Sequence, residues 1–162
     1  MVSPNPRKGH MRLALLMTLL AIPAFAADDC KIEAGPHDVV KKTGDVVIEA
    51  GQQVEDAIAV EGLVTIKRGA KVKSAISLHG NVVIEDGATV TKSAVSIGGT
   101  VKLGKGATVN NTVEISDAGL RVRGDDGNDI DLNIVIAGKS LGQRVADEAL
   151  SKLKNCRIVA KK

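Results

Sequence analysis

The segment GDVVIEAGQQVEDAIAVE, residues 44–61, decides the fold, because its apolar residues come in pairs two positions apart and a new pair begins every six residues. Alternate residues of a β-strand face the same side, so each pair predicts a short strand with one buried face. The pattern continues to residue 122, and the inward pairs we expect are Val46/Ile48, Gln52/Val54, Ile58/Val60, Val64/Ile66, Ala70/Val72, Ile76/Leu78, Val82/Ile84, Ala88/Val90, Val95/Ile97, Val101/Leu103, Ala107/Val109, Val113/Ile115 and Leu120/Val122. Three such strands close a coil of about eighteen or nineteen residues, a period typical of solenoids. The expected fold class is all-β, a single-stranded three-sided β-solenoid (β-helix) of about four to five coils with one C-terminal α-helix.

Residues one coil apart should stack as ladders of similar shape if the coils are in register. The expected ladders are Ile48, Ile66, Ile84, Leu103 and Val122 on the first side, Val54, Val72, Val90 and Val109 on the second, and Val60, Leu78, Ile97 and Ile115 on the third. A fourth ladder, Gln52, Ala70, Ala88 and Ala107, stays small after its polar first member. Glycines recur at matching turns, where a sharp corner needs conformational freedom: Gly44, Gly51, Gly62, Gly69, Gly80, Gly87 and Gly106. One extra residue before Val95 predicts a bulge at a corner.

Residues 1–26 have the three parts of an export signal. Arg7, Lys8 and Arg12 form a basic region, an apolar run follows from residue 13 to 22, and the small-x-small site at residues 24–26 predicts cleavage between Ala26 and Ala27. The apolar run is too short for a membrane span. Either Met1 or Met11 could be the initiator. We therefore expect a periplasmic or secreted chain of residues 27–162, with no transmembrane span after the signal is removed.

Composition excludes two classes of binding protein. The chain has 22 Lys and Arg against 19 Asp and Glu, and the three basic residues of the signal account for the whole formal excess of +3. Nucleic-acid binding needs a basic surface, which a neutral mature chain does not offer. The one aromatic side chain, Phe25, also lies in the signal, so the mature chain cannot stack sugars or bases on aromatic rings.

The two cysteines, Cys30 and Cys156, lie just outside the repeats on either side. In an oxidising compartment such a pair predicts a disulfide, although two buried thiols are the alternative. A loop of this size would contribute roughly 4 kcal/mol through the unfolded state.

The repeats, residues 44–122, are flanked by two dissimilar segments. Residues 27–43 are irregular, include a loop histidine, His37, and are expected to form a cap over the open edge of the first coil. Residues 123–162 predict a turn, a strand from Ile130 to Ile136, and a helix that begins with a capping box at Ser140 and Gln143. The apolar stripe of this helix is Leu141, Val145, Ala149, Leu150 and Leu153.

The stripe predicts where the helix packs. A helix over residues 141–154 spans about 20 Å, enough to return along the third side of the solenoid and bring Cys156 to Cys30. The surface expected to receive it is the set of small residues Ala57, Ala59, Ala75, Ser77, Ala94 and Ser96. In the alternative, the helix caps the last coil and the cysteines pair between molecules.

Charged residues at outward positions alternate in sign from coil to coil. Glu49, Glu55 and Glu61 of the first coil stand one coil from Lys67, Lys73 and His79 of the second, and Glu85 follows in the third. Opposite pairs across a ladder lie about 4.8 Å apart and contribute about 0.2–1 kcal/mol each. This arrangement predicts a charge lock, that is, ion pairs that fix the register between neighbouring coils. It gives His79, stacked over Glu61, a structural role and not a catalytic one.

The segment after the repeats contains candidate calcium ligands. Asp126-Gly127-Asn128-Asp129 resembles a fragment of the calcium-binding nonapeptide repeats of secreted toxins, and with Asp125 and Asp131 it supplies four carboxylates, Asp125, Asp126, Asp129 and Asp131. The alternative is a simple turn of Asp, Gly and Asn residues.

Three stretches resemble the bactofilins, bacterial scaffold proteins built as β-solenoids: residues 44–49, 80–88 and 98–101. The resemblance covers about half of the chain. It implies a polymer-forming structural protein that assembles through uncapped coil ends, whereas this chain has an export signal and flanking caps.

An enzyme is the rival interpretation. Hexapeptide-repeat acyltransferases share the period of six, and Ala70, Ala88 and Ala107 suit their small-residue position, but Ile76 and Val82 are large where small residues are needed. The related zinc carbonic anhydrases use three histidines, and residues 27–162 contain only His37 and His79. We therefore expect a non-enzymatic envelope protein without a cofactor, whose partners are further copies of itself or cell-envelope components. The alternatives are an acyltransferase-like enzyme and a secreted, calcium-stabilised adhesion or binding module.

Overall fold

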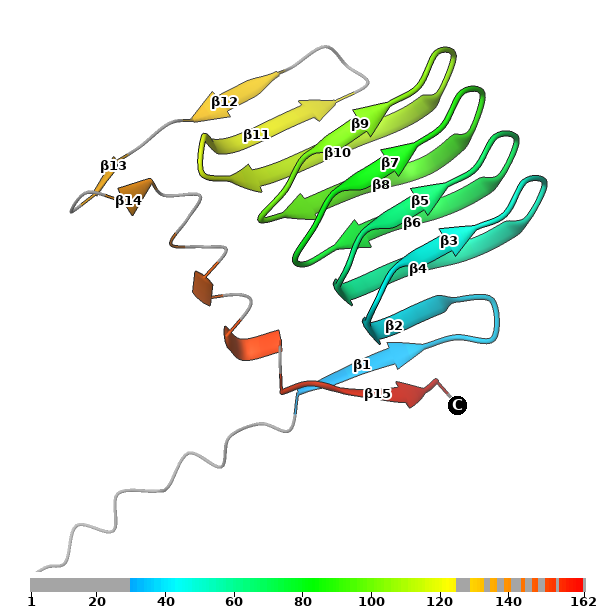
Figure 1. The fold of residues 1–162 in the computed structure, drawn as a ribbon, viewed down its shortest axis with the longest axis horizontal. Coiled ribbons are helices and arrows are strands. Elements are labelled where there is room, and N and C mark those ends of the chain that lie inside the picture. The colour runs from blue at the N-terminus through cyan, green and yellow to red at the C-terminus, as the bar shows by residue number, and fades with distance from the viewer. Residues whose placement is uncertain are drawn as a thin grey trace, which may run out of the picture.

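The chain folds as a β-solenoid of stacked parallel coils in the computed structural model (Figure 1). The structure describes residues 30–124, 129–132, 135–136, 139–140, 144, 147–148, 151–153 and 155–161. The predicted signal and its cleavage site at Ala26 and Ala27 lie outside these residues. Within the described part, four complete coils stack along one axis, which confirms the predicted fold class.

One wall of the solenoid is a sheet of four short parallel strands, here called the narrow sheet. Its strands are β3 (Val46–Ile48), β5 (Val64–Ile66), β7 (Val82–Ile84) and β9 (Val101–Leu103). They pair without a shift, Ile48 with Ile66, Ile66 with Ile84 and Ile84 with Leu103. The first predicted ladder is therefore correct as far as Leu103.

The opposite wall is a sheet of seven strands in the order β12-β11-β10-β8-β6-β4-β2, here called the wide sheet. Its strands are β2 (Val39–Thr43), β4 (Gln53–Glu61), β6 (Lys71–Ser77), β8 (Thr89–Ile97), β10 (Thr108–Ser116), β11 (Gly119–Gly124) and β12 (Ile130–Leu132). From β2 to β10 all neighbours are parallel. Each coil thus consists of one short and one long strand, because the predicted second and third sides run on as a single strand.

The long strands correct the prediction for the third side. On β4, Val54 faces inward, but the next inward residues are Ala57 and Ala59, which are 0% exposed and belong to the core. Ile58 lies between them and is half-buried outside that cluster. Two residues separate Val54 from Ala57 and four separate Ala59 from Val64, where the pattern predicted three in each corner, so the two shifts cancel over one coil. The period of eighteen survives, while the residues of the third side that join the core cluster are shifted to the other face. Val60 and Leu78, which were predicted to face inward, are nevertheless buried, 1% and 9% exposed, outside that cluster.

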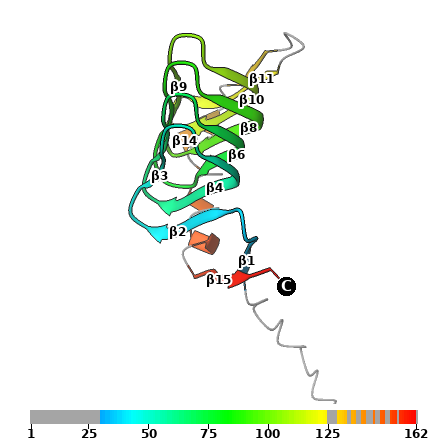
Figure 2. The ribbon, with the colours of Figure 1, turned by 90° about the vertical axis from the view of Figure 1, so that its right-hand side faces the viewer.

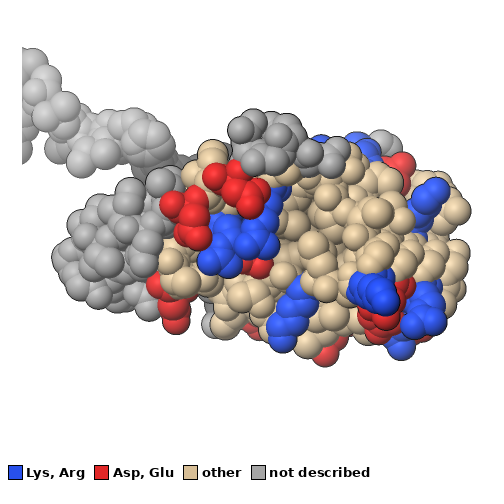
Figure 3. Space-filling model, turned by 90° about the horizontal axis from the view of Figure 1, so that it is seen from above, with Lys and Arg blue, Asp and Glu red and all other residues tan. Residues whose placement is uncertain are grey.

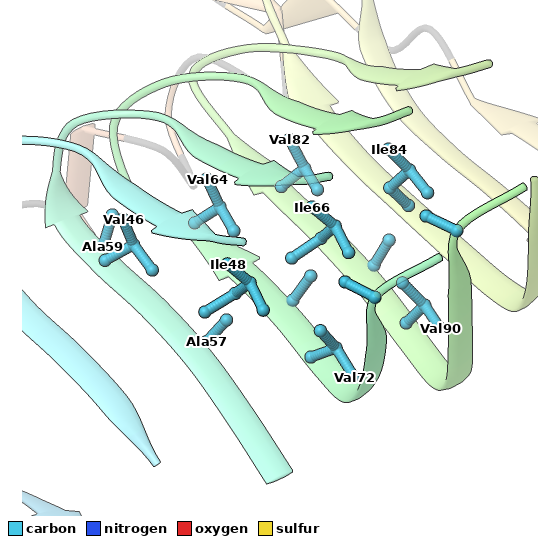
Figure 4. Close-up of a cluster of buried hydrophobic side chains, with 14 residues drawn as sticks. Val46, Ile48, Ala57, Ala59, Val64, Ile66, Val72, Val82, Ile84 and Val90 are labelled. Carbon is cyan, nitrogen blue, oxygen red and sulfur yellow. The ribbon is translucent and has the colours of Figure 1, made fainter. Parts of the chain in front are cut away.

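The small residues expected on the outside of the third side therefore line the inside. Ala75, Ser77, Ala94 and Ser96 are buried with Ala57 and Ala59. Small side chains are needed there because the wide sheet approaches the narrow sheet closely, and the larger Ile76 is half-buried on the other face. Figure 4 shows Ala57 and Ala59 pointing toward Val46 and Ile48 of the facing sheet.

The core is one continuous cluster between the two sheets (Figure 4). Its largest fully buried members are Ile48, Ile66 and Ile84 from the narrow sheet, followed by valines of both sheets, Val46, Val64, Val72, Val82 and Val90. Burial of each such side chain stabilises the fold by about 1.5–3 kcal/mol. Successive coils repeat the same contacts, so most of the stability lies in the ladders.

The extra residue of the third coil forms a bulge, as predicted. Val72 pairs with Val90 and Ser74 with Ser93, so residues 91 and 92 of β8 lie opposite the single residue Lys73 of β6. The insertion is absorbed at the bend between the two halves of the long strand. The register is restored within two residues on either side.

Glycines occur at the corners of the coils for two reasons, a positive φ or a close approach of the backbone. Gly51, Gly69, Gly87 and Gly106 each lie two residues before a long strand, with φ between 66° and 76°, a conformation that residues with a side chain rarely adopt. Gly80 instead allows a close approach, since a Cβ there would lie 2.6 Å from the carbonyl oxygen of Gly62. The spacing of these glycines in the sequence therefore follows the coil.

The last predicted strand turns back and does not start a fifth coil. β11 pairs antiparallel with β10, which sets Val122 opposite Val113. The prediction of Val122 in the first ladder is therefore wrong. β12 continues the sheet, antiparallel to β11, and the wide sheet ends there.

The segment before the repeats is more regular than predicted. β1 (Lys31–Ala34) pairs in parallel with β15 (Arg157–Ala160) to form a separate two-stranded sheet. β2 is already a strand of the wide sheet, paired with β4. The solenoid therefore starts at residue 39, and β1 and β15 lie beyond its lower end (Figures 1 and 2).

The C-terminal segment is described in part. β13 (Val135–Ile136) and β14 (Lys139–Ser140) pair antiparallel, so Ser140 ends a strand where a helix cap was expected. Residues 144, 147–148 and 151–153 are helical. Leu153 is half-buried, and the other members of the predicted stripe, Leu141, Val145, Ala149 and Leu150, lie outside the described residues.

An ion pair lies on the exposed side of this helix. Lys152 donates a hydrogen bond of 2.7 Å to Glu148, and this bond, together with the charge of Lys152, lowers the pKa of Glu148.

Among the described residues, no helix has the length and apolar character needed to cross a membrane.

Candidate functional site

A disulfide joins the two ends of the described chain. Cys30 and Cys156 are bonded within one molecule, with their Cα atoms 4.5 Å apart. Each stands directly before a strand of the two-stranded sheet, where Arg157 donates its backbone N–H to the carbonyl of Cys30 over 2.9 Å. Cys156 is 1% exposed. The predicted disulfide is therefore confirmed as an intramolecular clasp, and the alternatives of free thiols and of pairing between molecules do not hold in this structure.

The clasp requires the chain to return along the solenoid. β12 lies at one end of the wide sheet, beside β11, and β15 lies at the opposite end beside β1. The prediction that the chain returns along the solenoid and brings Cys156 to Cys30 is therefore correct. The surface proposed to receive the helix is wrong, because its alanines and serines face the core.

A cleft of about 650 Å³ opens between the end of β1, the turn before β2, and residues of β4 and β6 in the wide sheet. We call it the terminal cleft. It is lined by Glu33, Gly35, Pro36, His37, Asp38, Glu55, Asp56, Lys73 and Lys161.

Asp38 builds the wall of the terminal cleft. Its carboxylate accepts the backbone N–H of Gly35 over 2.5 Å and that of Asp56 over 3.1 Å. In the same wall, Glu55 donates its backbone N–H to the carbonyl of His37 over 2.9 Å. These bonds tie the turn at residues 35–38 to the first long strand. Asp38 therefore has a structural role.

The remaining polar groups of the terminal cleft are exposed and of both signs. Glu33 and Glu55 contribute carboxylates, and Lys73 and Lys161 contribute ammonium groups. His37 lies exposed in the turn, as expected from the sequence. Such a lining can form ion pairs with a polar partner that carries both charges. Within the described ranges no cluster of three His, Cys, Asp or Glu side chains could hold a metal ion.

Two of the four candidate calcium ligands are described, and each faces an arginine on β11. Asp131 lies 3.3 Å from Nε of Arg121, and Asp129 lies 3.6 Å from Nε of Arg123. These carboxylates bind cations of the chain itself. Asp125 and Asp126 lie outside the described residues.

One ion pair of the predicted charge lock is present: Nζ of Lys67 lies 3.9 Å from Glu49, one coil below. A second pair between coils was not predicted: Arg68 lies 3.8 Å from Asp86, one coil above. Both pairs are exposed, so each contributes at most about 1 kcal/mol. On the face shown in Figure 3, acidic and basic groups lie next to one another in small groups. His79 is exposed, and its backbone bridges Gly62.

Sequence reasoning missed the terminal cleft because it took residues 27–43 as an irregular cap. Two signals were present: the alternation of Lys31-Ile32-Glu33-Ala34, which suits a strand, and the turn residues 35–38 ahead of Val39 and Val40. The pairing of β1 with β15 spans 126 residues and has no local signature.

In comparisons with known proteins, no protein-family model, no curated protein and no solved structure matches the chain.

Proposed function

We propose that this chain is an exported, non-enzymatic β-solenoid with a structural or interaction role in the bacterial cell envelope. The observation that carries the proposal is the clasp between Cys30 and Cys156, which closes a solenoid whose sequence opens with a predicted export signal. Disulfides persist in oxidising compartments, so the clasp supports a periplasmic or secreted location.

The chemistry of the described side chains supports binding in place of catalysis. Asp38 accepts two backbone N–H groups, and the two described calcium candidates, Asp129 and Asp131, pair with arginines. The exposed charges of the terminal cleft are available to a partner. A polar envelope component with groups of both signs suits Glu55 and Lys73 there.

Self-assembly, which the bactofilin resemblance implies, depends on whether the ends of the coil stack can accept another copy.

Co-sedimentation tests the proposal. Purified residues 27–162 are mixed with isolated membrane and cell-wall fragments and centrifuged. The expected result is saturable binding that weakens with added salt and in Glu55→Lys, whereas Lys102→Glu, at the other end of the solenoid, binds like the unaltered protein. Absence of sedimentation at any concentration, or equal binding by all three proteins, contradicts a role for the terminal cleft in the envelope.

A further inference from the structure

In the narrow sheet, the first residue of each strand but the last donates its backbone N–H to a carbonyl of the next coil up. Val46 donates its N–H to the carbonyl of Leu63 over 2.9 Å, and Val64 and Val82 donate to Asn81 and Thr100 over 3.0 Å each. Val101 holds the same position on β9, the last strand of this sheet. A further coil would have to supply its acceptor.

Glu114 supplies that acceptor from a side chain. Its Oε1 accepts the N–H of Val101 over 2.7 Å, and its Oε2 lies 3.4 Å from Nη1 of Arg121. The side chain of Glu114 is 13% exposed. It is the last member of a row of inward residues that is otherwise small, Ala59, Ser77, Ser96 and Glu114. Among the coils that the structure describes, a long acidic side chain thus appears at the one that has no coil above it.

The lower end of the narrow sheet has a matching arrangement. Lys67 donates its N–H to the carbonyl of Ile48, as Glu85 does to Ile66 and Gly104 to Ile84. Glu49 is the equivalent residue of the first coil, and its N–H donates to Oε1 of Gln52 over 2.9 Å.

Gln52 is also the exception in its row. The row is Gln52, Ala70, Ala88 and Ala107, small everywhere except at the coil that has no coil below it. At each end, therefore, a long polar side chain replaces a small one and takes the hydrogen bond that the missing coil would take.

We propose that Glu114 and Gln52 terminate the coil stack and keep the solenoid from extending end to end with further copies of the chain. An edge strand with free N–H groups is a template for pairing with another chain. Here one donor at each edge is occupied, and beyond β10 the wide sheet continues in the antiparallel strands β11 and β12, not in a further parallel coil strand. This inference does not rest on the proposed function, because it concerns hydrogen bonds within the fold.

Hydrogen exchange of two backbone amides tests the caps directly. In Glu114→Ala the amide of Val101 should exchange about fivefold faster, the effect of one lost hydrogen bond, while Glu114→Gln, which keeps the acceptor oxygen, should leave it slow. In Gln52→Ala the amide of Glu49 should exchange faster by a similar factor. Gln53→Ala, at the exposed neighbouring position, is the control. Fast exchange of Val101 in Glu114→Gln, or no change in Glu114→Ala, overturns the assignment.

Light scattering tests termination. Residues 27–162 should stay monomeric as concentration rises, and the double variant Glu114→Ala/Gln52→Ala should associate. Filaments of the unaltered chain, or a folded double variant that stays monomeric despite faster exchange at both amides, would show that the caps do not terminate the stack.

Discussion

Cys30 and Cys156, 126 residues apart in the sequence, hold β1 and β15 side by side at the lower end of the solenoid. The loop that they close contains every coil. A disulfide that closes so long a loop removes much of the entropy of the unfolded chain.

Loss of the clasp should therefore lower the free energy of unfolding by about 2–5 kcal/mol. The variant Cys30→Ser/Cys156→Ser is compared with the unaltered protein in urea unfolding, with and without a reductant. Reductant should destabilise the unaltered protein to the level of the double variant and leave the double variant unchanged. Equal stability of the oxidised protein and the variant would contradict the role of the clasp.

A charge at the centre of the first ladder should be far more harmful than one beside it. Ile84 is 0% exposed between Ile66 and Leu103, and Ile84→Asp should cost more than about 3 kcal/mol. Val83 faces out and is half-buried, so Val83→Asp should cost about 1 kcal/mol. Thermal unfolding measures both, and equal losses would contradict the register.

The reversed third side makes its own prediction. Ala75 is buried against the narrow sheet, and Ala75→Leu should destabilise the fold by about 1–3 kcal/mol through overpacking. Ile76→Thr, on the outer face, should cost less, about 1 kcal/mol. If Ile76→Thr lowers stability more than Ala75→Leu in urea unfolding, Ile76 faces the core and Ala75 faces out, as the simple period of six suggests.

Removal of Asp38 should loosen the terminal cleft. Asp38→Ala leaves the N–H groups of Gly35 and Asp56 without their acceptor and should cost about 1–3 kcal/mol. Glu33→Ala, an exposed residue of the same cleft, is the matched control and should change stability little. Chemical denaturation of the two variants checks this, and the assignment of Asp38 fails if they unfold alike.

The stacked architecture could be predicted from the sequence because the ladder of Ile48, Ile66 and Ile84 and the corner glycines repeat with the coil. The face of the third side could not, since one corner is a residue shorter and the next a residue longer than the pattern predicted, which leaves the period unchanged. The turn-back at β11 was missed because Leu120 and Val122 alternate equally well in a parallel or an antiparallel strand. Gln52 was visible as a polar interruption, but its purpose depends on a hydrogen bond that only the fold reveals.

Of the candidate site, too, one part could be predicted from the sequence and another could not. The pairing of Cys30 with Cys156 could be predicted from their positions outside the repeats. The terminal cleft could not, because it depends on β1 and β15 meeting across the whole chain. The capping role of Glu114 was equally hidden, since an acidic residue in a strand next to a turn is common on protein surfaces.

The central claim, an exported solenoid clasped within one molecule, is tested most directly by the intact mass of the protein isolated from cells under denaturing, non-reducing conditions. The account predicts a monomer that begins at Ala27 and is lighter than the fully reduced chain by the two hydrogen atoms lost from Cys30 and Cys156. A chain that retains residues 1–26 with both thiols free, or disulfide-linked multimers, would contradict it.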